Sequence, residues 1–201
     1  MSVVLSFDRF RQRKRVPPLV LVDMFEDQRG RAPSIRSEDV SAVLTNCRLL
    51  LDNARSIGWP LGFTVDAHRL HQKHHLGAAW IDGFRPHRSD MVFETEGDSC
   101  YSSAEFAEAV TSTGNCFLLA GFSGARTCLT TLIEAPNHGH CGGIVEDACY
   151  VPALNGLDAL ASHRALIAVV SSYATTLTTT EWLNVGDTSR SELEPFHDAE
   201  R

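Results

Sequence analysis

The sequence predicts an α/β protein, a three-layer sandwich in which helices cover both faces of a six-stranded, mostly parallel sheet. Apolar runs of strand length alternate along the chain with longer segments of helical period. These runs are continuous rather than alternating, which is typical of parallel strands buried on both faces. The 201 residues suit one domain, and no repeat or linker divides them.

Local signals place each element. The first strand is the apolar run 19–22, which ends at Asp23, and a polar loop is expected over 26–33. A helix then begins near Ser37, which can cap it, and ends before Gly58. Further strands are expected at 60–64, 91–93, 116–120, 143–146 and 175–180, and further helices at 103–111, 127–137 and 158–174. Pro136 is expected to close the helix over 127–137, because proline disrupts a helix interior.

Composition and charge exclude several classes of protein. The net charge of −7 argues against a nucleic-acid partner, which would need clustered Lys and Arg. No run reaches the ~18 apolar residues of a membrane helix, so no membrane association is expected. Six cysteines without a CxxC pair indicate reduced thiols in a cytoplasmic protein. We expect an N-terminal segment over 1–15, one domain over 16–185 and a polar tail over 186–201.

A candidate site follows from the predicted sheet. In open parallel sheets, ligands bind outside the carboxyl ends of the strands. This rule selects Asp23, Asp66, the residues after Phe93 and the turn 121–128. A carboxylate directly after a buried strand must be paired or functional, so Asp23 is the first candidate.

The same positions resemble the isochorismatase-like (cysteine hydrolase) family over roughly residues 18–185. The segment 21–24 resembles the strand that carries the family's catalytic aspartate, and 54–60 resembles its helix-to-strand turn. Gly121, Thr131 and Ala135 match its nucleophile helix in spacing. The resemblance implies an isochorismatase-like fold and an Asp-Lys-Cys triad in which the cysteine attacks a carbonyl. Family members without the cysteine can instead hydrolyse an enol ether with the aspartate as an acid.

The resemblance also implies that the usual lysine and cysteine are replaced. The lysine position falls on Thr95, and the nucleophile position, counted from Gly121 and from Thr131, falls on Thr127. Cys128 is one residue late, which turns its side chain by about 100° on a helix. A one-residue bulge within 122–126 would restore its direction. We expect a buried Cys128 and a Thr127 that binds substrate or caps the helix.

Other candidates line the expected pocket. Phe25 and Tyr101, with Trp80, are expected to form an aromatic enclosure, and Gly124 lies in the nucleophile turn. His68 belongs to an Asp-x-His segment that resembles the metal site of nicotinamidase relatives. We expect a substrate-facing His68, with no metal and no cofactor.

Three functional hypotheses remain open. The first is a hydrolase or lyase that acts on a small organic acid, amide or enol ether, with Asp23 as acid/base. The second is a triad-depleted relative that binds a small molecule or a partner without turnover. The third is an amidase that uses Cys128 through a shifted turn. The resemblance and the apolar stretch 151–154 also predict a homodimer or homotetramer.

Overall fold

The structure is a computed structural model that describes residues 16–30, 37–67 and 79–184. Its centre is one six-stranded sheet of order β3-β2-β1-β4-β5-β6, in which every neighbouring pair is parallel. The strands are β1 (Leu19–Val22), β2 (Leu61–Asp66), β3 (Met91–Thr95), β4 (Cys116–Gly121), β5 (Cys141–Cys149) and β6 (Thr175–Leu177). The predicted α/β fold with a six-stranded sheet is therefore confirmed, and the sheet is parallel throughout rather than mostly so.

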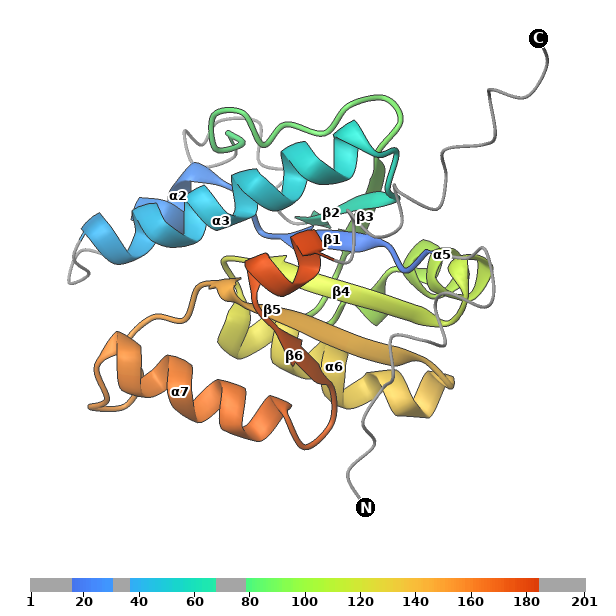
Figure 1. Cartoon of the computed structure of the whole chain (residues 1–201). Helices are drawn as coiled ribbons and strands as arrows, with labels where there is room; N and C mark the ends of the chain where they lie inside the picture. The colour runs from blue at the N-terminus through green and yellow to red at the C-terminus, as the bar shows by residue number, and fades with distance from the viewer. Residues whose placement is uncertain (1–15, 31–36, 68–78, 185–201) are drawn as a thin grey trace, which may run out of the picture.

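Helices cover both faces of the sheet (Figure 1). On one side lies the long helix α3 (Ser37–Ser56), preceded by the short α2 (Glu26–Gly30). On the other side lie α5 (Ala104–Thr113), α6 (Leu129–Glu134) and α7 (Ala159–Val170). Short helical turns complete the chain at η2 (Cys100–Ser102), η3 (Gly124–Cys128) and η4 (Ala135–His138).

Two apolar cores hold these layers together. Successive residues of a strand point to opposite faces, so β1 serves both cores. Leu19 and Leu21 join the core under α3, whereas Val20 and Val22 join the core under α5, α6 and α7. All four side chains are fully buried, which explains the continuous apolar run.

Several elements differ from their predicted bounds. The expected polar loop over 26–33 contains α2, and the expected helix over 127–137 is split into η3, α6 and η4. Pro136 lies within η4 rather than at the end of an α-helix, because the first turn of a helix tolerates proline. β6 ends at Leu177, three residues before its expected end.

In the described residues no helix is both long and apolar enough to cross a membrane.

The sheet order produces a topological switch point between β1 and β4, which is called the crevice below. From β1 the chain builds β2 and β3 on one side and β4, β5 and β6 on the other, so the connections diverge between β1 and β4. Such switch points are where open α/β sheets bind ligands. Gly121 ends β4 there with φ 124°, and a Cβ at this position would lie 2.2 Å from the Val22 carbonyl oxygen. Only glycine therefore allows this close approach of the two strand ends.

Candidate functional site

Asp23 lies at the crevice, directly after β1, and is partly exposed. Its φ of 54° is left-handed, a conformation that aspartate tolerates better than most residues. The Asp23 N–H donates to the Thr64 hydroxyl on β2 at 3.1 Å, and the Asp23 carbonyl accepts from the Phe25 N–H at 2.8 Å. These two bonds fix the backbone from which the carboxylate projects.

Thr127 lies across the crevice, in the turn after β4. This turn, η3, is one turn of π-helix, and the Cys128 N–H donates to the Ser123 carbonyl at 3.0 Å. A π turn accommodates one extra residue, but this one spans 124–128 rather than 122–126, where a bulge was considered from the sequence. The Thr127 hydroxyl donates to the Ser123 hydroxyl at 3.1 Å, and its side chain is 7% exposed. Thr127 is therefore buried beside the crevice, with its hydroxyl held by Ser123.

Cys128 remains in the core despite the π turn. It is fully buried among the residues that pack under α5, α6 and α7. A hydrogen bond to the Cys149 thiol, followed by burial, raises the pKa of Cys128 well above its ordinary value. The negative charge of Asp23 raises this pKa further. Such a thiol stays protonated at neutral pH and is a poor nucleophile.

Thr95 ends β3 and is buried, 5% exposed. Its hydroxyl donates to the Val65 carbonyl at 3.4 Å, and it pairs in register with Asp66, the last residue of β2. The part of the chain that the structure describes contains no lysine, since Lys14 and Lys73 lie outside it. The described site therefore offers a neutral hydroxyl where the family resemblance places a cation.

The three rings expected to enclose one pocket are divided between two places. Phe25 stacks on Trp80 with centroids 4.3 Å apart, and Trp80 packs against the core under α3. Tyr101 packs against the opposite core and stacks on His138. No ring contact joins Tyr101 to either of the other two within the described residues. The single aromatic enclosure predicted from the sequence is thus not formed.

Gly124 and His68 were also predicted to face substrate. Gly124 is instead buried against the end of β5, where a Cβ would lie 2.8 Å from both the Cys149 sulfur and the Tyr150 carbonyl oxygen. Its role in the structure is close packing. His68 lies outside the described residues. Within the described part of the chain, no group of His, Cys, Asp and Glu side chains is arranged to hold a metal ion.

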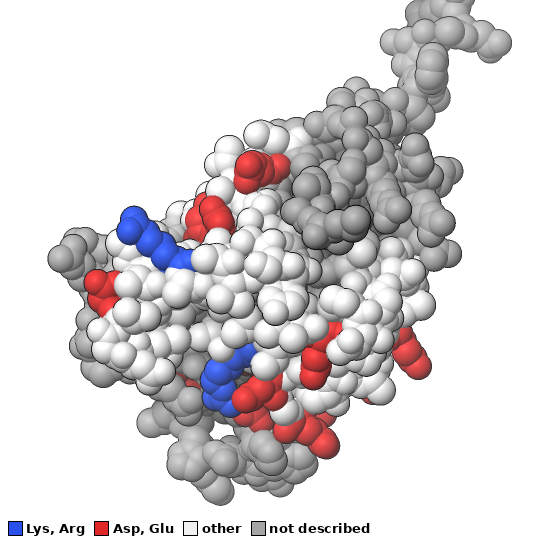
Figure 2. Space-filling view, turned by 90° about the horizontal axis from the view of Figure 1, so that it is seen from below, with Lys and Arg blue, Asp and Glu red and all other residues white. Residues whose placement is uncertain are grey.

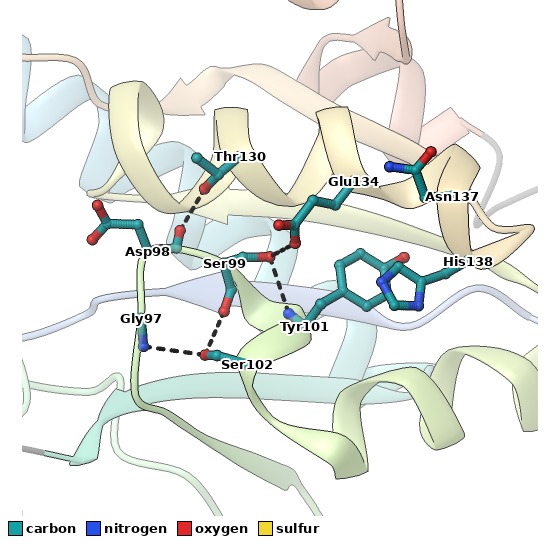
Figure 3. Close-up of a pocket in the computed structure, with 9 residues that line it drawn as sticks. All are labelled: Gly97, Asp98, Ser99, Tyr101, Ser102, Thr130, Glu134, Asn137 and His138. Carbon is teal, nitrogen blue, oxygen red and sulfur yellow. Dashed lines mark hydrogen bonds between the residues drawn. The ribbon is translucent and has the colours of Figure 1, made fainter.

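Sequence reasoning missed a groove beside α6, with a volume of about 500 Å³ (Figure 3). One wall is formed by residues of the segment 97–102, and the other by residues of α6 and η4. Thr130, Glu134 and His138 recur every four residues along that second wall. This spacing places them on one helical stripe, and it was the available signal for the groove.

Sequence reasoning also missed Thr64 and Ser123, which form hydrogen bonds with Asp23 and Thr127. Only the folded sheet brings these residues together.

Residues 17–181 of the chain match the isochorismatase domain family. Among solved structures, an isochorismatase from Pseudomonas putida is 21% identical, over 89% of this chain and 99% of that one, with a TM-score of 0.73. A cysteine hydrolase from Pseudomonas syringae pv. phaseolicola is 13% identical, over 87% and 93%, with a TM-score of 0.73. N-carbamoylsarcosine amidase from Thermoplasma acidophilum is 20% identical, over 82% and 96%, with a TM-score of 0.62. None of the curated proteins compared with the chain matches it.

The chain belongs to the isochorismatase family of hydrolases, because the family match spans most of its length. At these identities the solved structures show a shared fold alone. The family resemblance stated from the sequence is confirmed. The family match does not assign the substrate or the catalytic residues of this chain, so both have to be argued from the geometry of the site.

Proposed function

We propose that this protein hydrolyses or cleaves a small organic acid, amide or enol ether with Asp23 as the acid/base and without a covalent cysteine intermediate. One observation carries the proposal: Asp23 is partly exposed at the crevice, whereas the Cys128 thiol is buried and hydrogen-bonded to the Cys149 thiol. In this proposal the family triad is degenerate, with Thr95 and Thr127 in place of its lysine and cysteine. Their hydroxyls hydrogen-bond the substrate.

An enol ether suits this arrangement best. In its protonated form, the Asp23 carboxyl donates a proton to the terminal carbon of the double bond, which forms an oxocarbenium ion. Water adds to that cation and loses a proton, and the resulting hemiketal separates into an alcohol and a carbonyl compound. The released proton restores the Asp23 carboxyl. No thiolate or ammonium group is required at any step.

Two other functions have a specific observation in their favour. The neutral Thr95 beside Asp66 favours a relative that binds a small molecule or partner without turnover, because a hydroxyl does not replace an ammonium group. The π turn at η3 favours an amidase, since it adds the residue needed to redirect Cys128. Burial of the Cys128 sulfur weighs against that amidase.

The test is a product assay with enol ethers, primary amides and N-carbamoyl compounds. Released carbonyl or ammonia is measured for the wild type, Asp23→Asn and the control Asp52→Asn, which alters an exposed carboxylate of α3. We expect turnover of an enol ether by the wild type and the control, and its loss in Asp23→Asn. Saturable binding without product from any class would support the non-catalytic alternative. A covalent mass adduct on Cys128 would support the amidase.

A further inference from the structure

The groove beside α6 is separate from the crevice at Asp23. Its lining comes from the loop after β3, from η2 and from the exposed side of α6 and η4. Figure 3 shows Thr130 opposite Asp98 and Glu134 opposite Ser99, with His138 against the Tyr101 ring farther along the groove. Neither the family match nor the proposed chemistry gives these residues a role.

The side chain of Glu134 lines this groove, and a hydrogen bond holds its carboxylate in place. The Ser99 hydroxyl donates a short hydrogen bond to Glu134 Oε2, and Ser99 Oγ in turn accepts from the Tyr101 N–H at 3.2 Å. Among the described residues Glu134 Oε1 has no hydrogen-bond partner. A half-buried carboxylate with one oxygen anchored and one available is preorganised to accept from a ligand.

Tyr101 and His138 form an aromatic platform beside that carboxylate. Their rings stack with centroids 4.0 Å apart and an angle of 2° between planes. The Tyr101 ring is held in place by a 2.9 Å hydrogen bond between its hydroxyl and His140 Nδ1, and by an edge-to-face contact with Phe106. His138 is exposed, and its ring nitrogens have no hydrogen-bond partner in the described chain. A flat ligand can therefore stack on its outer face.

The charges of the groove favour a cation. Its lining contains two carboxylates, Asp98 and Glu134, and no Lys or Arg. Asp98 is already paired with Arg126, which lies outside the lining, so Glu134 is the carboxylate available to a ligand. A guanidinium or amidinium group matches both features, because it is planar and presents parallel N–H donors.

We infer that this groove binds a ligand carrying a guanidinium or amidinium group, which donates to Glu134 and stacks on His138. The exposed Asn137 amide, one helical turn from Glu134, supplies a further acceptor and donor at the end of the groove. The inference does not depend on turnover at Asp23. Binding is expected to be the same in Asp23→Asn.

The experiment is an NMR titration of the ¹⁵N-labelled full chain with butylguanidine, compared with pentylamine, which has similar length and charge but no planar cation. We expect saturable shifts in the segments 99–102 and 134–138, and binding of butylguanidine about fivefold tighter than that of pentylamine, because only the former stacks. Equal affinities, or no saturable binding at about 10 mM, a concentration at which even weak fragment contacts are detected, would overturn the inference.

Three substitutions test whether butylguanidine binds in this groove. Glu134→Gln, which preserves size, is expected to weaken butylguanidine binding about tenfold, a loss typical of a charge-assisted hydrogen bond. The control Glu108→Gln removes the same charge from an exposed position on α5 and is expected to change nothing. His138→Ala is expected to reduce the preference for butylguanidine over pentylamine. Equal losses in Glu134→Gln and Glu108→Gln would mean that the probe senses overall charge and not the groove.

Discussion

At the residue scale, the central pair is Thr127 and Cys128. Spacing from Gly121 and from Thr131 predicted that Thr127 takes the nucleophile position and that Cys128 is buried, and the structure buries the Cys128 thiol. The π turn could not be predicted from spacing. Within it, Gly124 packs closely against Cys149 and Tyr150, and the sequence does not show that contact.

Burial of Cys128 leads to a prediction about reactivity. We expect iodoacetamide to label the partly exposed Cys116 and Cys141 well before Cys128, because a buried thiol with a raised pKa supplies almost no thiolate. Cys128→Ala should lower the free energy of unfolding by about 1–2 kcal/mol through lost packing. Peptide mapping by mass spectrometry and urea denaturation check the two parts. Early labelling of Cys128 would contradict the buried position.

A second prediction concerns Thr64, which holds the backbone of Asp23. Thr64→Val keeps the shape of the side chain but removes the oxygen that accepts the Asp23 N–H. We expect kcat to fall about tenfold with KM nearly unchanged, because the acid/base is misplaced while the substrate contacts remain. Thr64→Ser restores the acceptor and should restore kcat. A Thr64→Val enzyme with unchanged kcat would show that Asp23 does not need this bond.

At the scale of elements, the apolar runs predicted where each strand lies but not its length. β5 extends to Cys149, three residues past the expected end, because its last residues pair beside Gly121 after a register shift. α2 was missed because a five-residue helix has no room for an apolar period. His140, directly before β5, makes hydrogen bonds to Tyr101 of η2 and Thr111 of α5. Sequence patterns did not predict these bonds.

The His140 contacts predict a pH effect on stability. Thr111 Oγ1 donates to the Ala107 carbonyl and so accepts from His140 Nε2–H, which leaves Nδ1 to accept from the Tyr101 hydroxyl. Burial, with the neighbouring His138, lowers the pKa of His140 below its ordinary value. The folded state then binds fewer protons than the unfolded chain just below pH ~6.5, so the free energy of unfolding falls as the pH drops through this region.

Urea denaturation at pH 7.5 and at about pH 5.5, one unit below the ordinary histidine pKa, measures this effect. We expect a smaller loss of stability on acidification in His140→Gln than in the wild type. Some pH dependence should remain, because burial also lowers the pKa of His163. An identical pH dependence in the two proteins would show that His140 does not contribute.

At the scale of the whole molecule, the fold was predictable because strand and helix signals alternate without interruption. The order of the strands in the sheet was not predictable, because it depends on the side of β1 on which each later strand is placed. The stretch 151–154 was expected to be exposed; Leu154 is exposed, but Val151 is buried. Several exposed apolar side chains lie on and around α6 and α7: Ile133, Leu154, Leu157, Leu160, Val169 and Tyr173. Figure 2 shows that side of the molecule from below, with a broad uncharged area between the charged side chains.

The homodimer or homotetramer remains a prediction, and this face is where we expect its contact. Leu160, on α7, is 59% exposed, so Leu160→Asp should shift the protein towards the monomer in sedimentation velocity at micromolar concentration. Leu49→Asp is the matched control, because Leu49 is 47% exposed on α3, across the sheet. A wild-type monomer would contradict the prediction of an oligomer. Equal dissociation by both variants would place the contact elsewhere.

The central claim is that Asp23 carries the chemistry and Cys128 does not. The most direct test is a side-by-side measurement of kcat/KM for Asp23→Asn and Cys128→Ala on the substrate found by the product assay. We predict a loss of at least about 100-fold in Asp23→Asn, as expected for removal of a general acid, and a change of less than about threefold in Cys128→Ala. A Cys128→Ala enzyme that loses activity while remaining folded would contradict the claim and establish Cys128 as the nucleophile.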